Sequence, residues 1–408
     1  MSRLRYDTAG ESHGPMLTVL VNGVPAGLEI DTDFINAELR RRQGGYGRGG
    51  RQRIETDAVT FTAGVRRGVG TGAPIVMQIP NRDSRLDDLE RTPPVHRPRP
   101  GHADLAGSVK WLTTDCRETL ERASARETAA RTAAGALARC LLREFDVEAF
   151  GFVRGMLDAV TDVAPAPGNL DTLFRARDAS DVYCPDARVS AQMIEIIRRA
   201  KVDKDTVGGL AEVHVFGCPI GLGSCVNWTE KLDARLAGAV MGIQAFKSVE
   251  IGLGKDCAFR TGSQVHDPIL YDASQQETAS LGFVRPSNNA GGLEGGMTNG
   301  MPVVVRGTMK PISTLLRGMP SVDLNTRQPE HSAYERSDVC ALSAASVVME
   351  NVVAFEIARA FLEKFGGDSM HEVQANYESF MDMARRLPLE PPMRDMRESP
   401  MESDQSEA

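Results

Sequence analysis

The chain has 408 residues and a formal net charge of -8, a composition typical of a globular protein long enough to bury a large core. No apolar run approaches the ~18 residues of a membrane span, and the N-terminus lacks an apolar signal segment, so we expect a cytoplasmic protein with no membrane partner. Seven cysteines without a Cys-x-x-Cys spacing argue against both a disulfide framework and a metal site.

Arginine dominates the basic residues, since only 8 of the 47 are lysines. Residues 1–139 hold 20 arginines and one lysine against 17 acidic residues, a net charge of +4, which leaves -12 for the remainder. Arginine binds carboxylates and phosphates through paired hydrogen bonds. The arginine-rich first third is therefore a weak indication of an anionic ligand.

The first segment of interest is Gly10-Glu-Ser-His-Gly14, directly before a strand predicted within 16–30. Its His13 has two interpretations: an ordinary surface histidine, or a loop histidine that transfers protons near neutral pH. A helix is predicted to open near Asp31 to Asp33 and to end at Gly44-Gly45.

That helix runs into Arg40-Arg-Arg-Gln-Gly-Gly-Tyr-Gly-Arg-Gly-Gly-Arg51. Cations at a helix C-terminus offset the helix dipole, which explains Arg40 to Arg42 without a ligand. Arg48 and Arg51 stand among glycines and have no such explanation. A small phosphate or carboxylate ligand fits them, and an Arg/Gly segment that binds RNA is the alternative. The single Tyr46 favours the small anion, so we expect no nucleic-acid partner.

A second unusual histidine lies in Arg97-Pro-Arg-Pro-Gly-His-Ala-Asp104. His102 sits in a Pro/Gly frame with Asp104 two positions further on. The segment is either a structural turn or a holder for a general acid.

The stretch from Leu120 to Leu142 predicts one long helix, started by Asp115 and Glu118 in a capping box. At 100° per residue, one face is apolar and should be buried, and Arg122 and Arg126 lie on it. The polar positions of the other face are predicted to be exposed: Glu127, Thr128, Arg131, Thr132 and Arg139. Buried guanidiniums need anions, either internal carboxylates or a bound ligand.

Two sequence echoes indicate two related units, about 8–145 and 205–366, within one domain over 1–383. Residues 21–28 resemble 215–222, and residues 71–77 resemble 299–305. Helices are predicted at about 189–200, 229–245 and 343–364. Residues 384–408 are charged and aperiodic, which predicts a disordered acidic tail.

The second unit offers amides, hydroxyls and glycines rather than charge. Its segments 244–247, 287–296 and 310–314 suit a planar heterocycle with a phosphate tail. None has the order of a standard nucleotide-binding loop. Asp338, in Arg336-Ser-Asp338, is either a base or a helix N-cap.

Taken together, residues 3–366 resemble the chorismate synthase family, through these segments in this order. The resemblance implies an α+β fold, a β-α-β sandwich with an internal two-fold repeat. It implies a lyase of the shikimate pathway that converts 5-enolpyruvylshikimate 3-phosphate to chorismate by 1,4-anti-elimination of phosphate, with reduced FMN and no net redox change. It also implies a homotetramer.

The resemblance gives the residues roles. His13 would protonate reduced flavin, His102 would protonate the departing phosphate, and Asp338, with the flavin N5, would help to remove the substrate C6 proton. The substrate's anionic groups would be held by Arg42, Arg48, Arg51 and Arg126. The flavin would be contacted by Arg122, Ala123, Ser124, Gln244, Ala245, Gly295, Lys310, Pro311, Ile312, Ser313, Thr314 and Arg336. Arg42 and Arg48 would also contact NADPH.

Two positions depart from the family pattern, Ser337 where many members have His and Ser343 where Pro is common. The source of reducing equivalents stays open between NADPH and a separate flavin reductase. Two other functions remain as alternatives, a polyanion or RNA binder without chemistry and a flavin oxidoreductase with net turnover of NADPH.

Overall fold

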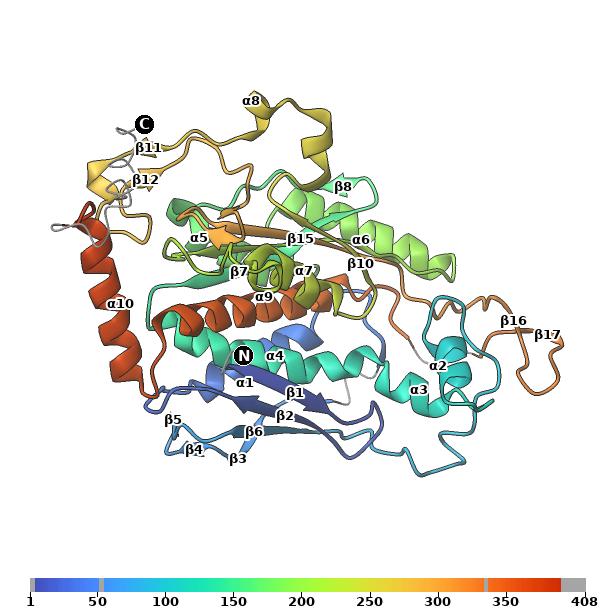
Figure 1. Cartoon of the computed structure of the whole chain (residues 1–408). Helices are drawn as coiled ribbons and strands as arrows, with labels where there is room; N and C mark the ends of the chain where they lie inside the picture. Colours follow the sequence, from blue (N-terminus) through green and yellow to red (C-terminus); the bar gives the residue numbers. More distant parts are fainter. Residues whose placement is uncertain (1–3, 51–54, 334–336, 390–408) are drawn as a thin grey trace, which may run out of the picture.

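The computed structural model describes residues 4–50, 55–333 and 337–389. Two antiparallel sheets enclose a layer of helices (Figure 1). This arrangement confirms the predicted α+β sandwich.

The first sheet has the strand order β1-β2-β6-β3. The strands are β1 (Arg5–Ala9), β2 (Met16–Asn22), β3 (Thr60–Ala63) and β6 (Ile75–Pro80). Because alternate side chains of a strand point to opposite faces, Leu17, Val19 and Val21 of β2 turn one apolar face to the core. The helices cover that face.

The second sheet has the order β10-β15-β9-β7-β8. Its strands are β7 (Glu148–Met156), β8 (Ala159–Val160), β9 (Gly209–Phe216), β10 (Phe246–Ile251) and β15 (Val303–Met309). Its outer face carries Phe150, Phe152 and Phe216, which pack against α5 (Leu170–Asp178). Because both faces are covered, β7 and β9 are buried almost throughout.

The helical layer contains α1 (Thr32–Gln43), α4 (Thr128–Arg143), α7 (Leu232–Met241) and α9 (Leu342–Phe365). Helices α4 and α9 cross closely at Gly135, where an added Cβ would lie 2.2 Å from the backbone oxygen of Asn351. Asp31 caps α1 by accepting a hydrogen bond from Phe34 N, as the predicted start requires.

The expectation of an exposed polar face on α4 is wrong. Thr132 is fully buried, and Glu127 and Arg139 are only 4% and 3% exposed, because α4 lies between a sheet and two other helices. Arg139 is accommodated by Glu38 at 2.9 Å and Glu350 at 3.0 Å. The predicted pair of Glu127 and Arg131 forms, at 3.0 Å, but its carboxylate is buried.

The continuous helix predicted over 120–142 is also wrong. It is divided into α3 (Arg117–Arg122), a single 3-10 turn (Ala125–Glu127) and α4. Ser124 adopts an extended conformation at the break, and its hydroxyl accepts from Arg126 N at 3.3 Å. The predicted capping box does not form, because the Asp115 carboxylate accepts from Val95 N and Arg117 N instead.

The two sheets share one topology, since β1-β2-β6-β3 corresponds to β7-β9-β15-β10. Helices α1 and α7 follow the corresponding strands β2 and β9, and α4 and α9 follow β6 and β15. The two sequence echoes fall at corresponding places. The second predicted unit, 205–366, leaves out β7, the counterpart of β1. The relationship between the units stays a prediction, which this correspondence supports.

The remaining elements lie around this sandwich (Figure 1). Helix α6 (Ala187–Val202) extends the predicted helix at 189–200, while α7 is shorter than predicted. Helix α10 (Met370–Arg385) runs two residues into the predicted tail, of which 390–408 lie outside the described residues. The smaller elements are β4 (Val65–Arg66), β5 (Val69–Gly70), α2 (Asp104–Lys110), α8 (Gly262–Val265), β11 (Leu270–Tyr271), β12 (Phe283–Val284), β13 (Leu293–Glu294), β14 (Met297–Thr298), β16 (Pro320–Val322) and β17 (Pro329–His331).

Candidate active site

A cleft of about 780 Å³ opens beside the break between α3 and α4. Its walls come from segments distant in sequence: the loop after β1, the C-terminal end of α1, the loop before α2, the junction of α7 with β10, the segment after β15, and the first turns of α9. Both sheets and the helical layer therefore contribute to one site.

Most of the predicted site residues line this cleft. They are His13, His102, Asp338, Arg42, Arg48, Arg126, Ala123, Ser124, Gln244, Ala245, Lys310, Pro311, Ile312, Ser313 and Thr314. Arg51 and Arg336 lie outside the described residues. Arg122 and Gly295 are not among the lining residues.

Arg42 and Arg126 share one buried carboxylate. Asp57 lies 2.6 Å from Nη1 of Arg126 and 3.4 Å from Nη1 of Arg42. Burial lowers the pKa of Arg42 to about 9, the charge of Asp57 raises it in part, and Arg126 and Arg48 lower it further. Nη2 of Arg126 is buried and has no hydrogen-bond partner among the described residues, although Glu55 lies 3.9 Å away. The pair thus retains donor capacity toward an anion.

The internal-carboxylate explanation for Arg126 is confirmed, and the bound-ligand explanation stays a prediction. Internal carboxylates do meet it, and it also lines the cleft. The same is not true of Arg122, which is exposed and donates to the backbone oxygens of Thr8 and Gly10. The break at Ser124 removes the common helical face on which the two arginines were expected to lie.

Arg48 is paired with the candidate base. Its Nη1 lies 2.9 Å from Oδ2 of Asp338, and Gly49 N donates to Oδ1 of the same carboxylate at 2.5 Å. Asp338 is thus held by two donors from the glycine-rich segment. Its alternative role as an N-cap is not seen, because α9 begins at Leu342 and has Ala341 at its N-cap.

His102 forms a dyad with a buried carboxylate. Its Nδ1 lies 2.5 Å from Oδ1 of Asp104, whose side chain has no exposed surface. Arg99 donates to Asp104 from Nε at 2.8 Å and from its backbone N at 3.0 Å. Burial raises the pKa of Asp104, but hydrogen bonds from His102 and Arg99 outweigh it and leave that pKa well below its usual range. An ionised Asp104 accepts the Nδ1 proton, so Nε2 of His102 is the atom that exchanges protons.

His13 forms a second dyad. Its Nδ1 lies 2.9 Å from Oε1 of Glu121, and its backbone N donates to Oε2 at 2.8 Å. Burial raises the pKa of Glu121, but the hydrogen bonds and charge of His13 lower it overall, and Arg117 adds to this. Two histidines with buried carboxylate partners thus face one cleft, from different loops.

The opposite wall comes from the second unit. Gln244 donates from Nε2 to Glu127 at 3.1 Å, while its buried Oε1 has no hydrogen-bond partner in the described part of the chain. Ala245 has φ 70°, a left-handed conformation rare for alanine, and its carbonyl accepts from Lys310 N. Lys310 Nζ reaches the backbone oxygen of Gly101, and burial followed by repulsion from Lys247 lowers the pKa of Lys310.

Gly295 lies elsewhere because it forms the turn of the β13–β14 hairpin. Its φ of 62° suits the tight turn, and the residue is exposed there instead of lining the cleft. The predicted contribution of the segment 287–296 is therefore not found in this cleft.

Several lining or supporting residues were missed from the sequence. Asp57, Asn81, Arg85 and Glu121 lie in segments without glycine-rich or histidine-bearing motifs. Arg99 was within a quoted motif but was given no role. These residues could have been found by asking what pairs with the site, because the buried arginines Arg42, Arg99 and Arg126 and the two partly buried histidines each require a polar partner.

The arrangement suits an anionic ligand that undergoes proton transfer. Five arginines and two lysines line the cleft together with two histidines and the carboxylates of Glu55 and Asp338. The other lining residues include Leu120, Met241, Ile243, Ala344, Ala345 and Val348. Within residues 4–50, 55–333 and 337–389, no helix is long and apolar enough to cross a membrane. In the same ranges, no three or more His, Cys, Asp or Glu side chains form a metal-binding group.

Comparison with known proteins identifies the family of this chain. The sequence matches the family described as chorismate synthase over residues 4–362. The chorismate synthase of Desulforamulus reducens is 50% identical over 393 residues, 94% of this chain and 100% of that protein. That of Desulforudis audaxviator is 52% identical over 394 residues, 94% of this chain and 98% of that protein.

A solved structure gives the same result for the fold. A crystal structure of chorismate synthase matches with a TM-score of 0.76 and 37% identity, covering 94% of this chain and 99% of that one. The chain therefore belongs to the chorismate synthase family.

Proposed function

We propose that this lyase binds reduced FMN and 5-enolpyruvylshikimate 3-phosphate together in the cleft of about 780 Å³. Membership of the family establishes the reaction, the 1,4-anti-elimination of phosphate that gives chorismate in the shikimate pathway. The observation that supports the proposed site is the convergence of two histidine–carboxylate dyads, five arginines and Asp338 on one cleft.

The residues on the second-unit wall fit a flavin. The buried Oε1 of Gln244 is an acceptor without a partner in the described chain, which suits an N–H of a heterocycle. Lys310, Ser313 and Thr314 offer an ammonium and two hydroxyls for a phosphate tail. When bound, reduced FMN supplies electron density to the substrate and regains it, so that the overall reaction has no net redox change.

The arginines hold the substrate. Arg42, Arg48 and Arg126, with Arg51 proposed from the resemblance alone, bind its phosphate and two carboxylates. The cleft lining keeps positive charge for the ligand, because five arginines and two lysines face it against only two acidic side chains, Glu55 and Asp338. Preorganised charge of this kind is worth more in a cleft shielded from water than in bulk solvent.

Proton transfer falls to three groups. Nε2 of His102 donates a proton to the departing phosphate, which removes the charge that would otherwise develop on it. The Asp338 carboxylate accepts the proton that leaves C6 of the substrate. His13 holds a proton for the flavin, and its Nδ1 contact with Glu121 leaves Nε2 for this purpose.

An anaerobic assay tests the proposed cofactor. Protein with dithionite-reduced FMN and substrate should release phosphate in many turnovers, whereas oxidised FMN or dithionite alone should release none. Equal release without FMN would overturn the proposal. Repeating the assay with NADPH and oxidised FMN, with and without an added flavin reductase, distinguishes the two sources of reducing equivalents. Consumption of NADPH in proportion to product would favour net redox turnover.

The quaternary structure and location are also proposals. We propose a homotetramer in the cytoplasm, as the family resemblance implies. Sedimentation equilibrium should give a mass four times that of the chain of 44.2 kDa. A monomer or dimer with full activity would contradict the tetramer, and fractionation of cells with an antibody would test the location.

A further inference from the structure

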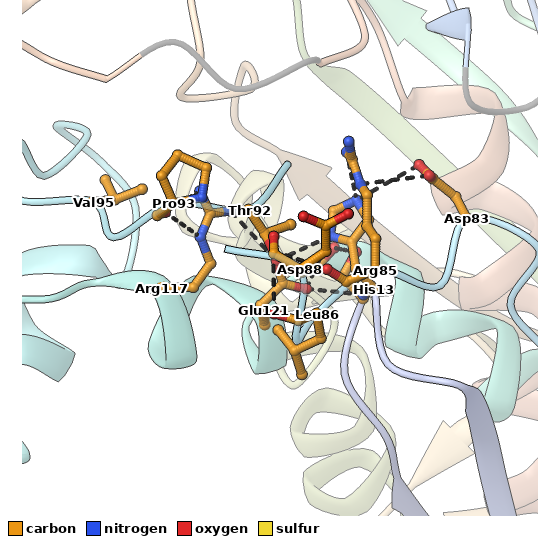
Figure 2. A network of polar contacts seen from close by, with 12 residues as sticks. His13, Asp83, Arg85, Leu86, Asp88, Thr92, Pro93, Val95, Arg117 and Glu121 are labelled. Carbon is orange, nitrogen blue, oxygen red and sulfur yellow. Dashed lines mark hydrogen bonds and ion pairs between the residues drawn. The ribbon is translucent and has the colours of Figure 1, made fainter. Parts of the chain in front are cut away.

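The ring of His13 is contacted by oppositely charged groups at its two nitrogens (Figure 2). At Nδ1 lies Glu121 of α3, 2.9 Å away and with no exposed side-chain surface. At Nε2 lies Arg85, from the loop after β6, whose Nη2 is 3.3 Å away. Asp83, from the same loop, is 3.8 Å from Nε2. These contacts of His13 thus comprise two carboxylates and one guanidinium.

The two contacts place different requirements on the two ring nitrogens of His13. A guanidinium is only a donor, so Arg85 can bond to Nε2 only when that nitrogen has no proton. Glu121 as a carboxylate is only an acceptor, so it requires the proton on Nδ1. Both hydrogen bonds can form at once only in the tautomer whose single proton is on Nδ1. A second proton on Nε2 would be favoured by the negative charges of Glu121 and Asp83 and opposed by Arg85.

Each partner is itself held in place. Arg85 N and Leu86 N both donate to the backbone oxygen of His13, at 2.9 and 3.1 Å, and Thr92 Oγ1 donates to Arg85 O at 2.8 Å. The Arg85 side chain also pairs with Asp83, Nε to Oδ1, at 3.4 Å. The loop after β6 is therefore tied to the histidine that its arginine contacts.

Glu121 is supported from the other side. Arg117 lies 3.5 Å from Oε1 of Glu121 and donates to the backbone oxygen of Pro93 from Nε at 3.1 Å and from Nη2 at 2.9 Å (Figure 2). Burial raises the pKa of Glu121, the hydrogen bonds and charge of His13 lower it overall, and Arg117 adds to this lowering and orients the glutamate. Charge and orientation are both determined before any ligand contacts His13.

We propose that Glu121 and Arg85 are opposing positioning residues that set the protonation state of His13. Glu121 fixes the tautomer and stabilises the imidazolium, while Arg85 stabilises the neutral ring through Nε2. Because Arg85 also lines the cleft, a ligand phosphate or carboxylate competes with Nε2 for its guanidinium. Departure of Arg85 frees Nε2 to take a proton from solvent, so His13 becomes a proton donor when the cleft is filled. Its use in turnover rests on the proposed function.

Histidine C2 hydrogen–deuterium exchange, read by mass spectrometry of the peptide that contains His13, measures the pKa of this ring without turnover. Arg85→Gln should raise that pKa by about one unit and Glu121→Gln should lower it by about one unit, each a ~10-fold change in the ratio of protonated to neutral ring. The step of the pH–rate profile that reports ionisation of His13 should move to higher pH in Arg85→Gln and to lower pH in Glu121→Gln.

Matched controls carry the same charge change on the same segments. Arg82 and Glu118 are exposed neighbours of Arg85 and Glu121, so Arg82→Gln and Glu118→Gln should leave the pKa of His13 within ~0.3 units. Circular dichroism checks the fold of each variant. If Glu121→Gln does not fold, the direction of the Arg85→Gln shift decides alone.

An unchanged or lowered pKa of His13 in Arg85→Gln would overturn the proposal, as would a raised pKa in folded Glu121→Gln. If the proposed function failed instead, the experiments would give a different set of results. There, His13→Asn would retain full turnover with reduced FMN, while the two opposite pKa shifts in the other variants would still be found.

Discussion

Nη1 of Arg48 lies 2.9 Å from Oδ2 of Asp338, which joins a proposed substrate ligand to the proposed base. The contact orients the carboxylate in the cleft. It also sets a competition, because an anionic substrate and Asp338 are alternative partners of one guanidinium. Substrate binding would therefore release Asp338 to accept a proton.

Replacing Asp338 by Asn should lower kcat for phosphate release by ~10²-fold or more, the usual scale for loss of a general base. Substrate affinity should be kept or improved, because Arg48 loses its competing carboxylate. Steady-state assays with reduced FMN measure both constants. Asp158→Asn, an exposed change in the β7–β8 turn, should have no effect. A normal kcat in Asp338→Asn would remove Asp338 from the mechanism.

His102→Ala should lower phosphate release by ~10²-fold or more, because the leaving group then departs without a proton. His96→Ala is the matched control, since His96 lies in the same segment but contacts the backbone oxygen of Thr114 instead of the cleft. Single-turnover release of phosphate under anaerobic conditions is the measurement. Equal rates for the two variants would show that His102 is only a structural turn residue.

Arg126→Met should affect both stability and binding. Asp57 would keep only its 3.4 Å contact with Arg42, and Asn81 would lose a 2.8 Å donor, so we expect a loss of ~1–3 kcal/mol in the free energy of unfolding. KM for the substrate should rise as well. Arg188→Met, an exposed change at the start of α6, should alter stability by at most ~0.5 kcal/mol. A loss of stability with an unchanged KM would leave Arg126 with a structural role only.

Glu38 should make the fold sensitive to acid. Burial raises its pKa, but the charges of Arg41 and Arg139 outweigh it and lower the pKa from 4.5 to about 2. Because the folded pKa lies below the unfolded one, the stabilisation is present above pH ~4.5 and is lost as the pH falls toward ~2. The difference corresponds to about 3 kcal/mol.

Urea unfolding at several pH values between 6 and 2.5 measures this contribution. Glu38→Gln should flatten the dependence of unfolding free energy on pH, whatever its effect at neutral pH. Glu144→Gln, at an exposed site after α4, should leave the slope unchanged. An unaltered slope in Glu38→Gln would show that other groups dominate acid unfolding.

The sequence predicted the fold well where local signals are strong. The start of α1 was predicted from Asp31, and the extent of α9 followed from its apolar period and from Gly366 at its end. The break at Ser124 was missed because alanine, arginine and leucine all favour helix, whereas tertiary contacts of Ser12 and Asn81 hold the chain open there. The buried state of Thr132 and Arg139 was missed because two layers enclose α4.

Candidate site residues were predicted where glycine, proline or histidine marks a loop. The side chains that pair with those residues were not predicted. Glu121, Asp57 and Arg85 contact them only through tertiary packing. A carboxylate on an ordinary helix carries no local sign of its distant partner. The amides and hydroxyls of segments 244–247 and 310–314 indicated a heterocycle site, and the family resemblance gave Gln244 and Lys310 roles as flavin contacts. The structure adds the unpaired amide oxygen and the close contact with Gly101.

The positive charge of the cleft around Arg42 and Arg126 links the lifetime of the protein in a cell to its substrate. Cationic side chains outnumber acidic ones in the lining, and a polyanionic substrate relieves the repulsion among them. Burial does most to lower the pKa of Arg42 to about 9, and the charges of Arg126 and Arg48 lower it further. A ligand that binds only the folded chain at a hundredfold excess over its Kd adds about 2.7 kcal/mol of stability. When metabolite supply falls, that protection is withdrawn, and proteases meet a less stable chain. The supply of substrate would thus help to set how much of the enzyme persists.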